Sequence, residues 1–143
     1  MSRVIVDATD AILGRLASRV AKELLRGNRV DIVNAEKAVI SGGRESIVES
    51  YRGWMETRQV ANPRKGPKHP KYPEDIVRRA VRGMLPYKKP KGREAYRRLR
   101  VYRGVPEHLA GKEFMRIPEA DAAKLRSKYI KVEELSRFLG ARV

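Results

Sequence analysis

The sequence predicts an α/β domain, and three observations lead to that prediction. Residues 4–6 form a short apolar run, and Val30-Asp31-Ile32-Val33 predicts a second strand. Between them lies a stretch with the apolar spacing of an amphipathic helix, and a strand, a helix and a strand in that order indicate a parallel βαβ unit. The length of 143 residues suits one domain, so we expect residues 1–143 to form a single folded unit.

The helix between these strands has signals at both ends. Thr9 or Asp10 is expected to cap its start, and Gly27-Asn28 is expected to end it. Its apolar positions share one face: Leu13, Ala17, Val20 and Leu24. The opposite side carries a stripe of four cations: Arg15, Arg19, Lys22 and Arg26. Two interpretations of this stripe stay open, a solvated surface and a contact with phosphates.

Residues 38–40 predict a third strand, although the link through residues 34–37 is shorter than a parallel crossover normally needs. Ser41-Gly42-Gly43 then leads into a helix with apolar residues at helical spacing: Ile47, Val48, Tyr51, Trp54 and Met55. A glycine turn at a helix N-terminus can hold a phosphate. This one lacks the ending of a P-loop and the spacing of a dinucleotide fingerprint, so a plain turn is favoured. Tyr51 and Trp54 are favoured as core residues rather than base-stacking platforms.

Positive charge is concentrated in residues 58–103, which hold sixteen Lys and Arg against three acidic residues, a net +13 of the chain's +16. The flanks are nearly balanced, with nine bases to eight acids before this segment and eight to six after it. Self-repulsion on this scale works against a compact state unless a large polyanion neutralises it, and nucleic acid is the leading candidate. A membrane is less favoured, because the segment holds six of the eight prolines and lacks a long amphipathic helix.

Several classes of protein are disfavoured by composition. The chain has no Cys, and His69 and His108 cannot form a zinc site alone, so neither a disulfide framework nor a thiolate or zinc site is expected. We expect no cofactor. It has no apolar run near 18 residues and no signal-peptide pattern after Met1, so a cytosolic protein is expected.

The basic segment itself divides into three parts. Residues 62–73 contain closely spaced prolines and no apolar set, which predicts an extended arm that follows a nucleic-acid backbone, with a disordered linker as the alternative. Pro73 is expected to start a helix that ends near Gly83 and Pro86, with these residues facing inward: Ile76, Val77, Ala80, Val81 and Met84. The residues expected to face outward on it are Arg78, Arg79 and Arg82. A short loop with Lys88, Lys89 and Lys91 then leads to a fourth strand at residues 99–102.

The chain also carries a long signature. Val81-Arg82-Gly83-Met84-Leu85-Pro86 is followed after five residues by Gly92-Arg93, and after five more by Leu99-Arg100-Val101-Tyr102-Arg103-Gly104. This pattern resembles the diagnostic motif of the L-thirteen family of large-subunit ribosomal proteins. Residues 6–8, 13–18 and 33–37 are similar to the same family in the expected order, so the resemblance covers about residues 3–110. The amino-acid sequences of residues 62–67 and 82–87 resemble those of the archaeal and eukaryotic branch of this family. Residues 111–143 are less diagnostic, although four of them suit a final packed helix: Val132, Leu135, Phe138 and Leu139.

The resemblance implies a three-layer α/β/α domain around a small parallel sheet of about four strands, in the order 3-2-1-4, bound to large-subunit ribosomal RNA and beside other ribosomal proteins in the cytoplasm. It implies no reaction, no small-molecule substrate and no membrane. The residues expected to contact RNA are the following: Arg58, Arg64, Lys65, Lys68, His69, Lys71, Arg78, Arg79, Arg82, Lys88, Lys89, Lys91, Arg93, Arg97 and Arg98. Two alternatives are a nucleotide-dependent RNA enzyme that uses residues 41–43 with Asp7 or Asp10, and an architectural DNA-binding protein.

Residues 62–72 generate a prediction about order. They have four cations, no acid and no apolar pattern, so the free protein lacks the burial that would offset their conformational entropy. We expect trypsin to cut the free protein rapidly at Arg64, Lys68 or Lys71, and we expect these bonds to be protected in the assembled subunit. Equal resistance in both states would contradict an arm that RNA orders.

Overall fold

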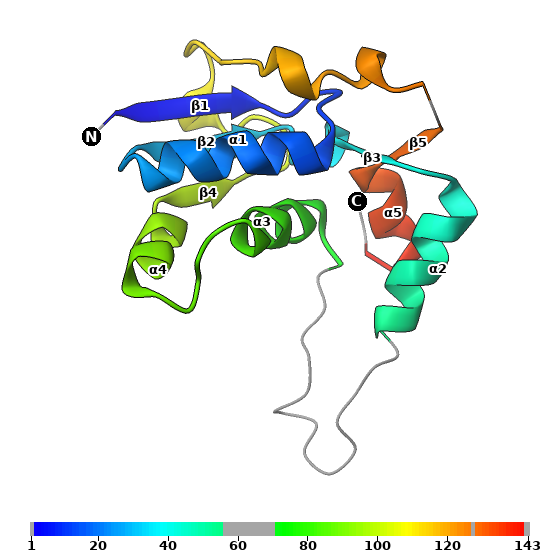
Figure 1. The fold of residues 1–143 in the computed structure, drawn as a ribbon. Coiled ribbons are helices and arrows are strands. Elements are labelled where there is room, and N and C mark those ends of the chain that lie inside the picture. The colour runs from blue at the N-terminus through cyan, green and yellow to red at the C-terminus, as the bar shows by residue number, and fades with distance from the viewer. Residues whose placement is uncertain (1, 56–70, 127, 142–143) are drawn as a thin grey trace.

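A computed structural model describes residues 2–55, 71–126 and 128–141, and its elements alternate between strands and helices (Figure 1). Strands β1 (Arg3–Asp7) and β2 (Arg29–Val33) are parallel neighbours, and helix α1 (Leu13–Leu25) connects them. The predicted βαβ unit and the α/β class are therefore confirmed. Gly27 has a φ of 96°, a left-handed conformation that glycine adopts without strain, and it ends α1 as predicted.

Within the described residues the parallel sheet has three strands in the order β1-β2-β4, in which β4 is Leu99–Val101, so β2 is central. Strand β4 (Leu99–Val101), which was predicted, pairs directly with β2. The order 3-2-1-4 is therefore wrong for this chain, because β4 lies beside β2 and β3 (Val39–Ser41) is not a member of this sheet.

Strand β3 (Val39–Ser41) exists as predicted, but it pairs antiparallel with β5 (Tyr129–Lys131) in a separate two-stranded sheet. The link before β3 explains the difference. Asn34 has a left-handed φ of 56° and Ala35–Lys37 form one 3-10 turn, which is too little chain to return to the start of the parallel sheet.

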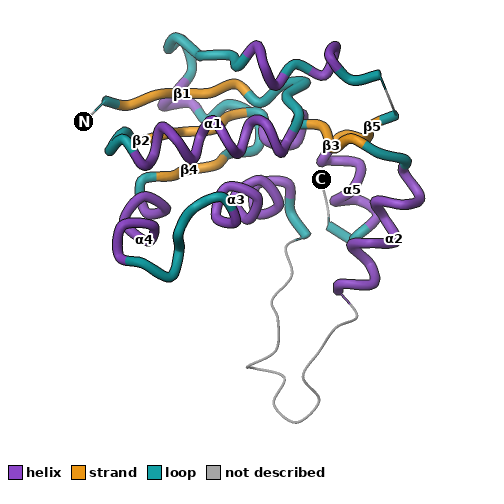
Figure 2. The backbone as a smooth tube through the Cα atoms, viewed as in Figure 1, coloured by secondary structure: helices purple, strands orange, loops and turns teal. Residues whose placement is uncertain are grey.

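The helices α1, α3 (Pro73–Gly83) and α4 (Pro90–Arg97) lie on the same face of the parallel sheet (Figure 2). Helices α2 (Arg44–Met55) and α5 (Val132–Phe138) flank the small sheet, as Figure 1 shows. Helix α4 was not predicted. None of the helices in the described part of the chain is long and apolar enough to cross a membrane.

One hydrophobic cluster joins α1, α3 and the sheet. Its fully buried side chains include Leu16, Leu24, Ile32 and Val77. The opposite face of the sheet carries a smaller cluster of Ile5, Val33 and Leu109, with Tyr102 and Phe114 packed on it. The third layer of the expected sandwich is therefore thin, since it consists here of an irregular segment with a 3-10 turn at Glu107–Leu109.

Three local expectations were wrong. Ile12, not Thr9 or Asp10, occupies the N-cap position of α1, and it makes no side-chain capping bond. Met84 is 48% exposed, because α3 ends one residue before it and Leu85 enters the core instead. Phe138 is 40% exposed on α5, where two guanidinium groups cover its ring.

Thr9 fails as a cap because the carboxylate of Asp7 engages it. Oδ1 of Asp7 accepts hydrogen bonds from the hydroxyl of Thr9 at 2.7 Å, from its backbone N–H at 3.0 Å and from the amide of Asn34 at 3.1 Å. Burial opposes ionisation of this carboxyl, but the hydrogen bonds and the charge of Arg116 hold its pKa below the usual value. Asp7 thus joins the carboxyl ends of β1 and β2.

The core on α1 allows a direct test. Leu24 is fully buried, so Leu24→Ala leaves a cavity and is expected to lower the free energy of unfolding by about 2 to 5 kcal/mol. Lys22→Ala, two residues away on the exposed side, is the matched control and is expected to change it by less than about 0.5 kcal/mol. Urea unfolding measures both, and a larger effect at Lys22 would reverse the assignment of the two faces.

Candidate nucleic-acid interface

Helix α3 places three guanidinium groups on the outside of the helical layer. Pro73 lies in the first turn of α3. Glu74 and Asp75 in the same turn place negative charge at the positive end of the helix dipole, which stabilises the helix. The residues that anchor its inner face are Ile76, Val77 and Val81. The residues on its other positions, each half-buried, are Arg78, Arg79 and Arg82.

Aromatic and guanidinium groups stabilise the loop between α3 and α4. The Arg82 guanidinium carbon lies 4.1 Å from the ring centroid of Tyr87, a cation–π contact. The ring of Tyr87 meets that of Tyr96 on α4 edge to face, with centroids 5.5 Å apart. Nη1 of Arg93 donates a hydrogen bond to the carbonyl of Lys88 at 3.0 Å. The loop is thus held from both helices.

Two lysines at the tip of this loop are exposed, Lys88 and Lys89. An open hollow of about 380 Å³ lies between the end of α3 and the tip, and Arg82 and both lysines line it. A polyanion that enters this hollow meets three cations at once.

Gly92 allows α4 to approach the loop closely. A Cβ atom at this position would lie 2.0 Å from the carbonyl oxygen of Pro86 and 2.8 Å from the backbone nitrogen of Tyr87. These are backbone atoms, which cannot move aside without displacing the turn. The position therefore requires glycine for reasons of space.

Tyr96 lies beneath this surface. Burial raises the pKa of its hydroxyl above the ordinary tyrosine value, although the positive charges of Arg78 and Arg82 act in the opposite direction. The phenol therefore stays neutral at physiological pH, and it adds no negative charge among these cations.

The remaining cations of α4 have two kinds of environment. Those that are exposed on the helix are Lys91, Arg93 and Arg97. Lys91 belongs to the first turn of α4 rather than to the loop where it was expected. Arg98 is half-buried, and its Nη2 donates a hydrogen bond to the carbonyl of Leu24 at 2.7 Å, near the C-terminal end of α1. The structure thus gives Arg98 a role in joining α1 to β4.

Ten of the fifteen residues predicted to contact RNA lie in the described part of the chain. The structure brings eight of them onto α3, α4 and their loop, which we call the α3–α4 surface: Arg78, Arg79, Arg82, Lys88, Lys89, Lys91, Arg93 and Arg97. Lys71 is exposed just before α3. The residues outside the described part are Arg58, Arg64, Lys65, Lys68 and His69. Residues 62–70 of the arm predicted at residues 62–73 lie there too.

Sequence reasoning left Arg103 out of the predicted set, although it lies in the same basic segment. Its Nε pairs with the Glu74 carboxylate at 2.9 Å, and its guanidinium carbon is 5.3 Å from the ring centroid of Tyr72. These contacts fix the start of α3 beside the end of β4. The only signal in the sequence was the local density of charge.

The geometry does not favour the nucleotide-dependent alternative. The N–H of Gly42, which a phosphate at this turn would need, donates instead to the carbonyl of Lys128 at 2.7 Å. Asp7 is engaged by Thr9 and Asn34, and Asp10 is exposed with Lys131 at 3.9 Å. Within the described residues, no group of three potential metal ligands converges.

A small α/β protein that gathers half-buried cations on one helix, and exposed cations on the next loop and helix, has the charge distribution of proteins that bind polyanions. The family is shown by comparison with known sequences. The model of the family described as ribosomal protein L13 matches residues 2–108, and the chain belongs to this family. In the structure, the signature noted at residues 81–104 spans the end of α3, the loop, α4 and β4.

Similar proteins cover nearly the whole chain. A large ribosomal subunit protein uL13 from Methanocaldococcus jannaschii is 51% identical over 140 residues, which is 96% of this chain and 98% of that protein. Proteins of the same name from Archaeoglobus fulgidus and Aeropyrum pernix are 49% and 50% identical, over 96% of this chain and 88% and 89% of their own lengths. The resemblance noted in the sequence, including its archaeal character, is confirmed.

The close approach at Gly92 predicts a strong effect of one methyl group. Gly92→Ala is expected to lower the free energy of unfolding by about 1 to 3 kcal/mol, because the new Cβ overlaps the Pro86 carbonyl. Gly83→Ala is the control: it lies at the end of α3 with nothing within 4 Å of an added Cβ, and it is expected to be neutral or slightly stabilising. Denaturant unfolding of both variants decides, and equal stabilities would contradict the requirement for glycine at residue 92.

Proposed function

We propose that this protein is a structural constituent of the large ribosomal subunit that binds folded large-subunit ribosomal RNA through residues 58–103 and supports subunit assembly. The α3–α4 surface carries the proposal, because Arg82 and Arg93 hold the backbone of the loop from which Lys88 and Lys89 project. Such a surface suits phosphates, and selectivity then comes from 2′-hydroxyl groups and from the shape of the folded RNA.

The proposal includes the wider setting of the protein. Neighbouring large-subunit proteins are expected partners, whereas a membrane, a small-molecule substrate and a catalysed reaction are not. The whole chain is proposed to act as one domain. Membership of a ribosomal protein family places it in the cytoplasm, within the ribosome.

Binding through phosphates predicts a steep dependence on salt. If six to ten cations contact phosphates, affinity for protein-free large-subunit RNA should fall by roughly 10³ to 10⁵ between 50 and 200 mM salt. Replacing Lys88 and Lys89 with Gln should reduce the slope of log K against log salt by about 1.4 to 1.8, since two contacts are lost.

The matched control replaces Lys112 and Lys124, two exposed lysines outside the basic segment, with Gln. This variant has the same net charge, so it separates position from total charge. Equal slopes for the two variants, or tighter binding to duplex DNA than to structured RNA at fixed salt, would contradict the proposal.

A further inference from the structure

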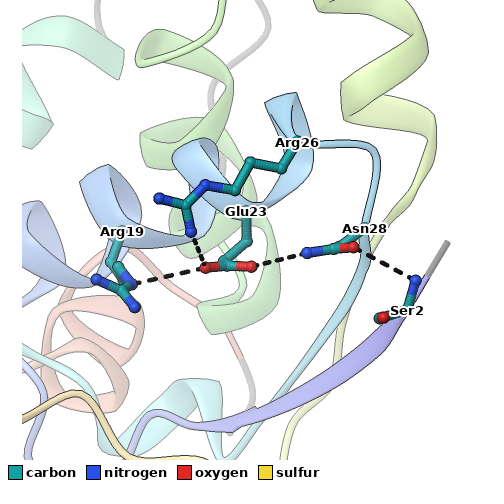
Figure 3. Close-up of polar contacts among 5 residues, drawn as sticks. All are labelled: Ser2, Arg19, Glu23, Arg26 and Asn28. Atoms are coloured by element: carbon teal, nitrogen blue, oxygen red, sulfur yellow. Dashed lines mark hydrogen bonds and ion pairs between the residues drawn. The ribbon is translucent and has the colours of Figure 1, made fainter.

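The outer side of α1 contains a cluster of charges that the α3–α4 surface does not include. Glu23 is 8% exposed, and its Oε1 accepts from Nη1 of Arg26 at 3.0 Å and lies 3.8 Å from Nε of Arg19 (Figure 3). Its other oxygen accepts from the side-chain amide of Asn28 at 2.8 Å. Burying a carboxylate is costly unless it is paired, and here both oxygens have partners.

This arrangement draws two arginines toward one point. Arg19 and Arg26 are seven residues apart, about 10 Å along a helix axis, yet both guanidinium groups reach the same oxygen of Glu23. Their side chains remain 44% and 63% exposed. Each guanidinium has five N–H donors, so most of these stay available to an anion from outside.

The cluster carries a net positive charge. One carboxylate, that of Glu23, can neutralise only one of the four cations on this stripe. The four cations are Arg15, Arg19, Lys22 and Arg26. Lys22 is exposed between the two paired arginines. Arg15 lies near the N-terminal end of α1, where its Nη1 donates a hydrogen bond to the carbonyl of Glu119 at 3.3 Å. The C-terminal end of α1 therefore has two guanidinium groups paired with one buried carboxylate, and an exposed Lys22 on the same stripe.

The position of α1 favours the same partner as the α3–α4 surface. Helix α1 packs against both α3 and α4 in one layer (Figure 2). Arg98, the residue before β4, donates a hydrogen bond to the carbonyl of Leu24 near the end of α1. A folded RNA that covers the outer side of this layer meets both groups of cations.

We propose that Arg19, Lys22 and Arg26 form a second phosphate-binding site for large-subunit ribosomal RNA, and that Glu23 is its positioning residue. The inference rests on the proposed function. By holding two flexible side chains in place before RNA arrives, Glu23 reduces the entropy that binding must remove. Of the two interpretations of the stripe on α1, this proposal favours contact with phosphates over a solvated surface.

Glu23→Gln separates positioning from simple charge, because the two predict opposite signs. Removing a carboxylate makes the stripe more positive, which alone would strengthen RNA binding. If Glu23 positions the arginines, binding to protein-free large-subunit RNA should instead weaken by about 2- to 10-fold. Unchanged or tighter binding would overturn the positioning role.

Asn28→Ala is the matched control. It removes the hydrogen bond from Asn28 to Glu23 and the contact of Asn28 Oδ1 with the backbone nitrogen of Ser2 at 3.3 Å, but it leaves both arginine pairs intact. It should leave RNA affinity unchanged whatever it does to stability. Equal loss of RNA affinity in Asn28→Ala and Glu23→Gln would mean that Glu23 only stabilises the turn.

A double replacement of Arg19 and Arg26 with Gln tests the site without depending on Glu23. It should reduce the salt slope by about 1.4 to 1.8, in addition to the loss caused by the Lys88 and Lys89 variant. If only the Lys88 and Lys89 variant has an effect, the second site is wrong and the proposed function stands. If neither variant has an effect, both proposals fail.

Discussion

The burial of α1 and α3 against one face of the parallel sheet is the interaction on which the rest of the structure depends. Leu16, Leu24 and Val77 belong to one hydrophobic cluster, and this shared core fixes the rotation of both helices about their axes. Once the apolar sides are committed to the sheet, the cations can lie only on the outer side of the layer. The α3–α4 surface and the stripe on α1 are thus consequences of the same packing.

Arginine and lysine have different roles among these cations. Several arginines are engaged by the protein itself: Arg82 with an aromatic ring, Arg98 with a carbonyl and Arg103 with a carboxylate. A planar guanidinium suits such contacts because it offers several donors in a fixed geometry. Lys88 and Lys89, which are exposed, are point charges on flexible stems. These arginines therefore stabilise the elements around the surface, whereas lysines supply much of its accessible charge.

Local pattern predicted the elements, whereas distant partners decided their arrangement. The strands at residues 4–6 and 30–33 and the helices α1 and α3 follow from apolar spacing, and all four are present. Helix α4 escaped prediction because it buries little more than Gly92 and Ala95, which leaves no apolar stripe to detect. The partner of β3 comes from residues 129–131, and no local signal identifies it. Charge density located the basic segment, but it could not show which cations the fold itself engages.

Helix α5 has a consequence for the relative position of α2 and α3. It contacts both of these helices, and its Leu135 is fully buried. Because its contacts with both helices hold it in place, α5 acts as the spacer that sets how far α2 lies from α3. The position of α3 thus depends on a helix that comes about fifty residues later and makes no part of the α3–α4 surface.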